Sequence, residues 1–363
     1  MAEQAETTAM AAALEAARRG PRGANPLVGA VILDADGRVR ATGHHAGAGT
    51  PHAEAAALAA LGTVPRDEAV RLTMFVTLEP CNHTGRTGPC AQAIVDAGIG
   101  RVVYATADGT DRASGGAHRL RAAGVDVRQG PLGAPARELN HRWFAARAAG
   151  RPFTTLHLAQ TLDGRIAAAD GSSQWITGAP ARAHSHGVRA AAEAIIAGTG
   201  TVLADNPRLT ARNPDGTPAA RQPLRVIMGN RDVPADAAVR GDGNWRHLRT
   251  HDPAAALRDL AASGIDHAMV EGGSSIATAF LSADLVDELW LYQAPLLLGA
   301  GRNAVGDLGI GTLSSARRLR LDATGGPSHQ LLGDDVVLHL EPLPHQEADS
   351  PAHTAPDGAE GRN

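Results

Sequence analysis

Three side chains that prefer the same metal stand apart in this chain, and a fold that uses them has to bring them together. His52 lies well before Cys81, and Cys90 follows nine positions later. These two cysteines are the only ones among 363 residues. One imidazole and two thiolates suit zinc, and three protein ligands leave a fourth position open for water, as catalytic zinc sites do. We therefore expect His52, Cys81 and Cys90 to bind Zn²⁺.

A carboxylate close to these ligands indicates what the metal would be used for. Glu54 lies two residues after the histidine, placed to move protons rather than to bind metal. Zinc lowers the pKa of bound water to about 7, and a neighbouring carboxylate can take the proton and pass it to a leaving amine. A His-x-Glu followed by Pro-Cys and a second cysteine is the signature of zinc nucleobase deaminases. We expect Glu54 to be the catalytic proton shuttle.

Apolar runs separated by turns predict an α/β chain with two domains. The length of 363 residues favours two domains. Residues 1–150 predict the order helix, strand, strand, helix, strand, helix, strand, helix, strand, which forms an α/β layer. A helix is expected from Thr7 or Thr8 to about Arg19, another from Cys90 to Ala97, and a third from about 136 to 148. Pro80-Cys81, directly after a strand, can also open a helix. Gly150-Arg151-Pro152 then marks a boundary near residue 150.

Two glycine-containing turns in residues 151–343 predict a dinucleotide site. Glu271-Gly272-Gly273-Ser274-Ser275 lies between a buried strand and a helix, where glycines allow close backbone approach and the helix N-terminus favours phosphate. It lacks the G-x-G-x-x-G spacing of a Rossmann fingerprint. Thr199-Gly200-Thr201 repeats the strand-turn-helix pattern. After Pro344 the chain stays polar, and residues 344–363 are expected to be disordered.

Composition narrows the cellular setting and the partners. The formal net charge of -4 gives no global basic field, so no nucleic-acid partner is expected. No apolar run of about 18 residues exists, which excludes a membrane span from the prediction. The N-terminus lacks the apolar core of a signal peptide. Two cysteines cannot build a disulfide framework, so they are expected to be thiolates in a cytoplasmic protein.

In its N-terminal half the chain resembles the bacterial bifunctional riboflavin-biosynthesis deaminase/reductase family. The shared motifs are Asn25-Pro26-x-Val28-Gly29, Gly43-x-His45, Pro51-His52-Ala53-Glu54 and Thr77-Leu78-Glu79-Pro80-Cys81. The insert from Cys81 to Cys90 resembles the family's C-S-H-x-G-[RK]-T-P-P-C, whereas cytidine and tRNA-adenosine deaminases mostly have P-C-x-x-C. The resemblance implies a cytidine-deaminase-like αβα layer domain. It also implies that the pyrimidine and phosphoribosyl pocket is lined by Asn25, His83 and Arg86.

In its C-terminal half the chain resembles the reductase domain of the same family. The shared motifs are Leu162-Asp163-Gly164-Arg165, Ser173-x-Trp175-Ile176-Thr177, Gly200-Thr201-Val202-x-Ala204-Asp205 and Val270-Glu271-Gly272-Gly273. The resemblance implies a dihydrofolate-reductase-like α/β fold that uses NADPH. The implied cofactor contacts are Ala159, Trp175, Thr201, Asp205, Gly272, Gly273, Ser274, Ser275, Ile276 and Ala277. The implied contacts with the phosphoribosylaminopyrimidine are Ser173, Arg189, Leu209, Arg212 and Glu271.

The resemblance thus implies two consecutive reactions. Zinc-dependent hydrolysis would deaminate 2,5-diamino-6-(5-phosphoribosylamino)pyrimidin-4-one, and hydride delivery from NADPH to C1 of the ribose would then open it to a ribityl chain. The cofactor carries the second reaction and the protein positions it. The same resemblance suggests a homo-oligomer.

Departures from the family pattern leave alternatives open. Ala107-Asp108-Gly109-Thr110-Asp111 stands where the family has D-P-N-P, and Val226-Ile227-Met228-Gly229 stands where it has V-I-D-S. His157 replaces a lysine. One alternative is a reductase whose deaminase half is inactive or acts on another pyrimidine, and a second is a nucleic-acid editor. A third is a structural zinc module closed by His83 or His45 as a fourth ligand.

Overall fold

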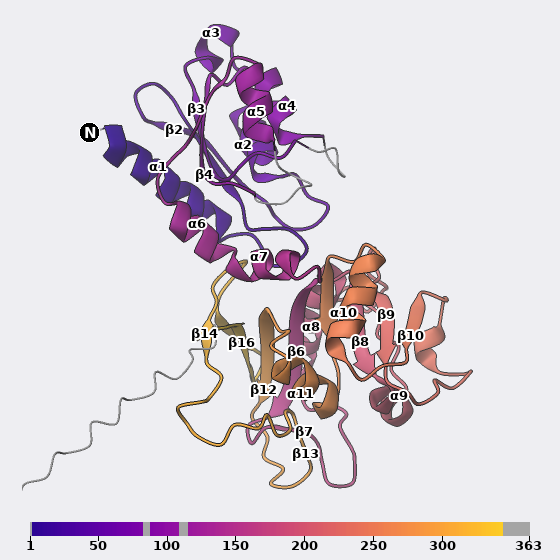
Figure 1. The fold of residues 1–363 in the computed structure, drawn as a ribbon. Coiled ribbons are helices and arrows are strands. Elements are labelled where there is room, and N and C mark those ends of the chain that lie inside the picture. The colour runs from indigo at the N-terminus through magenta and orange to yellow at the C-terminus, as the bar shows by residue number, and fades with distance from the viewer. Residues whose placement is uncertain (1, 83–87, 109–114, 344–363) are drawn as a thin grey trace, which may run out of the picture.

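The computed structural model describes residues 2–82, 88–108 and 115–343, and it contains two large β-sheets in sequence order (Figure 1). The first has five strands and the second nine. This confirms the α/β class expected from the sequence. Within the described ranges, no helix is long and apolar enough to cross a membrane. His83, Arg86 and the tail expected at 344–363 lie outside the described residues.

The first sheet has the strand order β2-β1-β3-β4-β5. Strand β1 is antiparallel to both β2 and β3, whereas β3, β4 and β5 run parallel. All five residues of β1 are buried, as expected for a strand with neighbours on both edges and layers on both faces. The bounds are β1 (Gly29–Leu33), β2 (Val39–His44), β3 (Thr73–Leu78), β4 (Arg101–Thr106) and β5 (Asp126–Gln129).

Helices cover both faces of this sheet and complete the expected αβα layers (Figure 1). One face packs against α1 (Ala2–Ala17) and α6 (Gly133–Leu139). The other packs against α2 (Ala53–Leu61), α4 (Cys90–Ala97) and α5 (Gly116–Ala122), with the short α3 (Arg66–Ala69) at one end. A Cβ added at Gly43 of β2 would lie 2.3 Å from backbone atoms of Ala53 and Ala57, so α2 approaches β2 more closely than a side chain would allow.

The second sheet has the order β10-β9-β8-β11-β6-β12-β16-β14, with β15 also paired to β16. The strands from β10 to β12 are parallel, and β16 is antiparallel to β12. The bounds are β6 (Phe153–Thr161), β8 (Ala194–Gly198), β9 (Leu224–Met228), β10 (Trp245–Leu248), β11 (His267–Val270), β12 (Glu288–Ala294), β14 (Leu319–Leu321), β15 (His329–Leu332) and β16 (Asp335–Pro342). Strands β7 (Arg165–Ala167) and β13 (Arg302–Asn303) form a separate ribbon.

Helices also cover both faces of the parallel part of this sheet. Helices α10 (Pro253–Ala262) and α11 (Ser274–Ser282) pack on one face. Helices α8 (Ala179–Ala191) and α9 (Thr199–Asp205) pack on the other, near the short helix η1 (Ala238–Arg240). Because β8 and β11 are adjacent and parallel, the turns that follow them open at the same edge of the sheet.

The structure corrects three expected helix boundaries. The single helix expected from about 136 to 148 is two helices, α6 and α7 (His141–Ala148), interrupted at Asn140. The Asn140 amide bonds both backbone groups of Leu27, at 2.7 and 2.9 Å, which ties the break to the first sheet. Helix α1 begins at Ala2 rather than at Thr7 or Thr8. Among the described residues, the next helix after β3 is α4, which has the expected bounds Cys90–Ala97, and no helix opens at Pro80-Cys81.

Candidate metal centre and dinucleotide site

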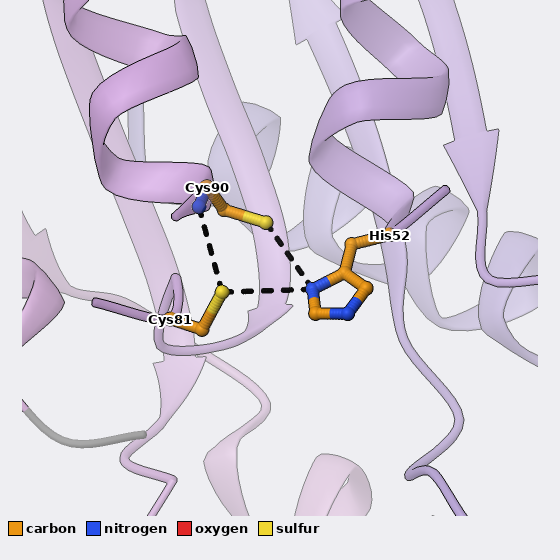
Figure 2. Close-up of side chains that lie close together, drawn as sticks. All are labelled: His52, Cys81 and Cys90. Atoms are coloured by element: carbon orange, nitrogen blue, oxygen red, sulfur yellow. Dashed lines mark hydrogen bonds between the residues drawn. The ribbon is translucent and has the colours of Figure 1, made fainter. Parts of the chain in front are cut away.

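The three expected metal ligands meet at one point (Figure 2). The Nδ1 atom of His52 lies 3.6 Å from Sγ of Cys81 and 3.3 Å from Sγ of Cys90. Zinc bonds of about 2.3 Å to sulfur and about 2.0 Å to nitrogen place two ligands of one tetrahedral ion roughly 3.5 Å apart. The side chains present therefore fit a zinc ion, and they hold this spacing without rearrangement.

Three different elements supply these ligands. His52 is the residue that precedes α2, Cys81 follows the buried strand β3, and Cys90 is the first residue of α4. The backbone N–H of Cys90 donates to Sγ of Cys81 over 3.4 Å. A helix N-terminus favours negative charge, so α4 stabilises a thiolate at this position. Both cysteines are buried and free of disulfide bonds, as expected.

The two thiols differ in their tendency to ionise because they share a hydrogen bond. That bond from Cys90, together with His52, lowers the pKa of the Cys81 thiol to about 4. The same bond and burial raise the pKa of the Cys90 thiol. The bond to Cys81 raises the pKa of His52 despite its burial. Cys81 is thus the more acidic of the two thiols, and a divalent cation would favour ionisation of both.

Glu54 is a buried carboxyl group beside the metal ligands. It lies in the first turn of α2, is 3% exposed, and its side chain contacts the Cys90 thiol. Burial raises the pKa of Glu54 to about 7. A carboxyl group with a pKa near neutrality can both accept and return a proton at physiological pH, which suits general acid-base chemistry.

His45 links the metal centre to Asn25. Because the Pro51 carbonyl can only accept, the Nδ1–H of His45 donates to it over 3.0 Å. The other ring nitrogen, Nε2, then accepts from the Asn25 amide at 2.8 Å. Both ring nitrogens are therefore occupied, and the alternative of His45 as a fourth zinc ligand is wrong. Among the described residues the ligand cluster contains His52, Cys81 and Cys90.

Beside the second sheet, two residues that are expected to hold the substrate form an ion pair with each other. They are Arg189 of α8 and Glu271, which follows β11. The Nη2 atom of Arg189 lies 2.6 and 2.8 Å from the two carboxylate oxygens of Glu271. Burial alone would raise the pKa of Glu271, but Arg189 beside it lowers that pKa. Arg189 also donates to the Thr210 carbonyl at 2.7 Å, next to Leu209. The expected substrate residues 189, 209 and 271 thus gather at one place.

The two glycine-containing turns also meet. The backbone N–H of Gly273 donates to Oγ1 of Thr201 over 3.3 Å, which joins the turn after β11 to the start of α9. A Cβ at Gly272 would lie 2.5 Å from Cβ of Ile276, so this position has no room for a side chain. Ser274 is the first residue of the nine-residue α11, and its backbone N–H groups can receive a phosphate.

The remaining expected residues occupy separate parts of the second half. Ala159 lies on β6 opposite Tyr292 of β12, and Asp205 ends α9. Ser173 and Trp175 lie between β7 and α8. The Trp175 ring is 68% exposed and packs under the Arg182 guanidinium, 4.5 Å from the ring centroid. Burial lowers the pKa of His186 to about 4, and the positive charges of Arg189 and Arg212 add to this effect.

Sequence reasoning missed one candidate in this half, His157. It was noted only as a replacement for lysine. Its Nε2 lies 2.9 Å from the Ser185 hydroxyl, and its ring lies 4.6 Å from that of Tyr292. Burial lowers the pKa of His157, and both Glu271 and Arg189 influence it, so it belongs to their cluster. The sequence feature that could have indicated His157 is its position on a strand that leads into the Leu162-Asp163-Gly164 motif.

Two family models match this chain. The RibD C-terminal domain matches residues 152–337. The cytidine and deoxycytidylate deaminase zinc-binding region matches residues 3–106, which include His52, Cys81 and Cys90. Each match contains one of the two clusters described above.

Similar proteins cover nearly the whole chain. The riboflavin biosynthesis protein RibD of Mycobacterium tuberculosis is 44% identical over 87% of this chain and 90% of its own. RibD of Corynebacterium ammoniagenes is 45% identical over 89% and 95%. The solved structure of Acinetobacter baumannii RibD has a TM-score of 0.72 at 33% identity, covering 94% and 99%. A diaminohydroxyphosphoribosylaminopyrimidine deaminase/5-amino-6-(5-phosphoribosylamino)uracil reductase from Thermotoga maritima has 0.70 at 30%, covering 94% and 100%.

Proposed function

The chain belongs to the RibD family, the bifunctional deaminase/reductases of riboflavin biosynthesis, and from this premise we propose how its residues divide the two reactions. Its cofactors are zinc and NADPH. We assign residues 1–150 to the deaminase and 151–343 to the reductase. The assignment is supported by the two separate sheets and by family models that fall on either side of residue 150.

The deaminase site consists of His52, Cys81 and Cys90 as zinc ligands and Glu54 as proton shuttle. The observation that carries this proposal is the convergence of one nitrogen and two sulfur atoms next to a buried carboxyl group. Bound zinc supplies a water that ionises near neutral pH. Glu54 would accept a proton from the attacking water and return it to the departing amine, and its pKa of about 7 suits both roles.

Substrate recognition in the deaminase is assigned to Asn25, His83 and Arg86. The amide of Asn25 is held by His45, which bonds the carbonyl of Pro51, the residue before the metal ligand His52. In the sequence, His83 and Arg86 lie between the two proposed zinc ligands Cys81 and Cys90. An arginine and a histidine there suit the phosphate of a phosphoribosylaminopyrimidine.

The reductase site is assigned to the edge of the second sheet where the two glycine-containing turns meet. NADPH contacts Ala159, Trp175, Thr201, Asp205 and the turn from Gly272 to Ala277. The phosphoribosylaminopyrimidine contacts Ser173, Arg189, Leu209, Arg212 and Glu271. The support is the Thr201–Gly273 hydrogen bond and the Arg189–Glu271 pair. The protein orients the nicotinamide so that hydride reaches C1 of the ribose.

The cellular compartment, the substrate class and the oligomeric state are proposed from the thiols, the net charge and the exposed apolar side chains. The free buried thiols favour a reducing compartment, so we place the enzyme in the cytoplasm. The net charge of -4 opposes a nucleic-acid substrate. Leu321 and Leu331, exposed by 54% and 72%, lie on strands that pair with β16. Apolar side chains exposed there favour a homo-oligomer that covers them.

A coupled assay tests the proposal. Zinc-loaded enzyme is supplied with 2,5-diamino-6-(5-phosphoribosylamino)pyrimidin-4-one and NADPH, and ammonia release and NADPH oxidation are followed together. We expect ammonia to appear first and NADPH oxidation to follow. NADPH oxidation only when the deaminated pyrimidine is supplied would instead establish the alternative of a reductase with an inactive or re-targeted deaminase half.

A further inference from the structure

The loop that carries Asn25 is fixed from several sides. The indole N–H of Trp143 donates to the Ala24 carbonyl at 3.1 Å. The Asn140 amide bonds the backbone N–H and C=O of Leu27 at 2.7 and 2.9 Å. These contacts come from the helix junction that connects the two sheets. They hold the backbone on both sides of Asn25, whose own amide reaches His45.

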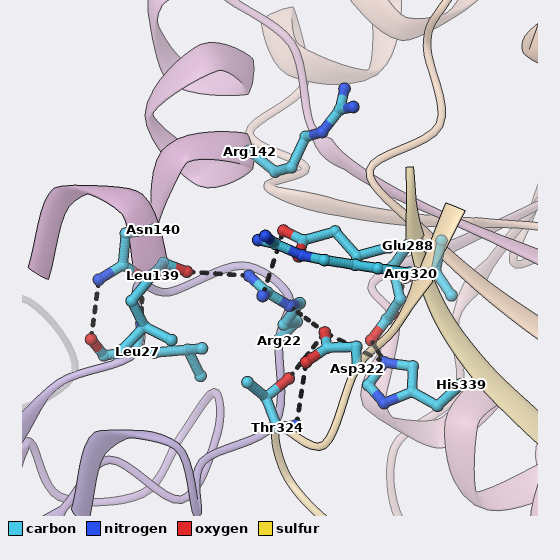
Figure 3. A network of polar contacts seen from close by, with 12 residues as sticks. Arg22, Leu27, Leu139, Asn140, Arg142, Glu288, Arg320, Asp322, Thr324 and His339 are labelled. Carbon is cyan, nitrogen blue, oxygen red and sulfur yellow. Dashed lines mark hydrogen bonds and ion pairs between the residues drawn. The ribbon is translucent and has the colours of Figure 1, made fainter. Parts of the chain in front are cut away.

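A third anchor, at Arg22, comes from the reductase half (Figure 3). The Nε atom of Arg22 lies 2.5 Å from Oδ2 of Asp322, and Nη2 lies 3.2 Å from Oε1 of Glu341. The Nη1 atom donates to the Leu139 carbonyl at 3.1 Å. The three charged side chains are 4%, 6% and 2% exposed. A charge buried this deeply is expensive without its partners, so the cluster has one strongly preferred arrangement.

The acidic partners of Arg22 are themselves held in place. The carboxylate of Asp322 accepts from the backbone N–H and the hydroxyl of Thr324, both at 3.0 Å. The second oxygen of Glu341 accepts from Arg320 at 2.8 Å. Glu341 lies on β16 and Asp322 directly follows β14. Arg22 is therefore fixed by the reductase sheet rather than by a mobile surface group.

A continuous set of bonds leads from this cluster to the metal centre. Arg22 and Asn25 are three residues apart in one loop. The Asn25 amide bonds His45 at 2.8 Å, and His45 bonds the Pro51 carbonyl at 3.0 Å. Pro51 directly precedes the ligand His52. If the loop moved at Arg22, the proposed substrate contact Asn25 would be displaced more than the zinc ligand His52.

We propose that Arg22, Asp322 and Glu341 form an interdomain anchor that positions Asn25 in the deaminase site, so that the deaminase half depends on the reductase half for substrate binding. The inference rests on the proposed function, because Asn25 is a substrate contact there. Arg22 acts through the loop and is a positioning residue. A small misplacement of a binding group is sufficient to weaken a site, because recognition requires near-correct geometry.

The test compares four variants of the full-length zinc-loaded enzyme. Arg22→Gln and Asp322→Asn each remove one side of the anchor, and a third variant carries both changes. Asp266→Asn is the matched control, since it breaks another ion pair between the halves, Asp266 to Arg147 at 2.5 Å, and leaves Arg147 bonded to the Asp266 carbonyl at 3.1 Å. The measurements are zinc content, deaminase and reductase kinetics, and hydrogen-deuterium exchange of the peptide covering residues 22–28.

In Arg22→Gln and Asp322→Asn we expect faster exchange in residues 22–28 and a deaminase KM raised about tenfold. Zinc content and reductase kcat/KM stay at the wild-type level. The double variant is no worse than the stronger single variant, because both remove the same anchor. Asp266→Asn behaves as wild type in all these measurements.

Several results would overturn the proposal. Unchanged exchange and unchanged deaminase KM in both anchor variants would show that the loop needs no anchor. Loss of zinc, or parallel loss of reductase activity, would show a general structural role. A wild-type enzyme that deaminates nothing would instead refute the proposed function, and the exchange measurement would still decide whether the anchor fixes the loop.

Discussion

The buried carboxyl group of Glu54 contributes to how the stability of this chain responds to pH when its metal is removed. Burial raises the pKa of Glu54 from 4.5 to about 7, so the folded state holds this proton more tightly than the unfolded state. The contribution of this proton to the free energy of unfolding is fully present below pH 4.5 and is lost as the pH rises through 7.

Glu54→Gln should remove this dependence, because glutamine stays neutral at every pH. In chelator-treated protein we expect the variant to gain up to about 3 kcal/mol in free energy of unfolding relative to wild type above pH 8, and little below pH 4.5. Urea unfolding at several pH values measures the difference. A difference between the two proteins that does not change with pH would contradict the assignment.

Arg231 offers a free positive charge beside the expected NADPH site. A Cβ added at Gly200 would lie 2.9 Å from its Nη2 atom, so the guanidinium rests against the turn that contains Thr201. In the described part of the chain, no hydrogen bond or ion pair occupies it. The neighbouring Asp232 is paired with Arg249 instead. A guanidinium in this position suits the 2′-phosphate that distinguishes NADPH from NADH.

We therefore expect Arg231→Gln to raise the KM for NADPH about tenfold and to leave the KM for NADH unchanged, since only NADPH carries the phosphate. Steady-state reductase assays with both cofactors measure this. Arg246→Gln, which removes a surface ion pair between Arg246 of β10 and Asp259 of α10, is the control. Equal effects of Arg231→Gln on both cofactors would contradict the assignment.

At the residue scale, the sequence predicted which side chains carry the chemistry better than it predicted the hydrogen-bond partners of those side chains. The types and order of His52, Cys81 and Cys90 were sufficient to expect a zinc site, and their atoms do converge. The tautomer of His45 and the pairing of Arg189 with Glu271 were not predictable. They depend on which carbonyl or carboxylate the fold brings alongside, and sequence spacing does not contain that information.

Helix α2 positions two site residues, and its approach to β2 depends on Gly43. The close contact with Ala53 and Ala57 means that a methyl group at residue 43 must displace α2, which carries Glu54 and follows His52. We expect Gly43→Ala to lower the free energy of unfolding by about 2 kcal/mol and to weaken zinc binding.

Gly187→Ala in α8 is the control for this prediction. A Cβ there meets nothing within 4 Å, so the change should raise the free energy of unfolding by about 0.5 to 1 kcal/mol through helix propensity. Urea unfolding and zinc content are measured for both variants. Normal stability and full zinc occupancy in Gly43→Ala would show that α2 tolerates the shift.

The elements themselves were predicted well where apolar periodicity was strong. The order of helices and strands in the first sheet follows the expectation, apart from the short α3. The break at Asn140 was missed because helix propensity continues through residues 136–148, while the reason for the break is a tertiary contact with Leu27. Helix α4 has the bounds expected from the sequence, Cys90–Ala97.

At the scale of the whole molecule, two catalytic halves are joined by a short helical connection, α7, and by buried charges (Figure 1). A boundary near residue 150 could be expected from Gly150 and Pro152. The pairing of Arg22 with Asp322, 300 positions later, could not, because lone arginines are usually solvated. The long-range polar contacts that connect the halves are visible only once both sheets are placed.

One measurement tests the central claim of two separate active sites most directly. Zinc content and NADPH oxidation are compared between wild type and Glu54→Gln, each reaction started either with the diaminopyrimidine or with its deaminated product. We predict that the variant keeps its zinc and oxidises NADPH normally with the deaminated product. Started with the diaminopyrimidine, its rate should fall by about 10² to 10⁴. Undiminished oxidation from the diaminopyrimidine, or loss of both activities, would contradict the account.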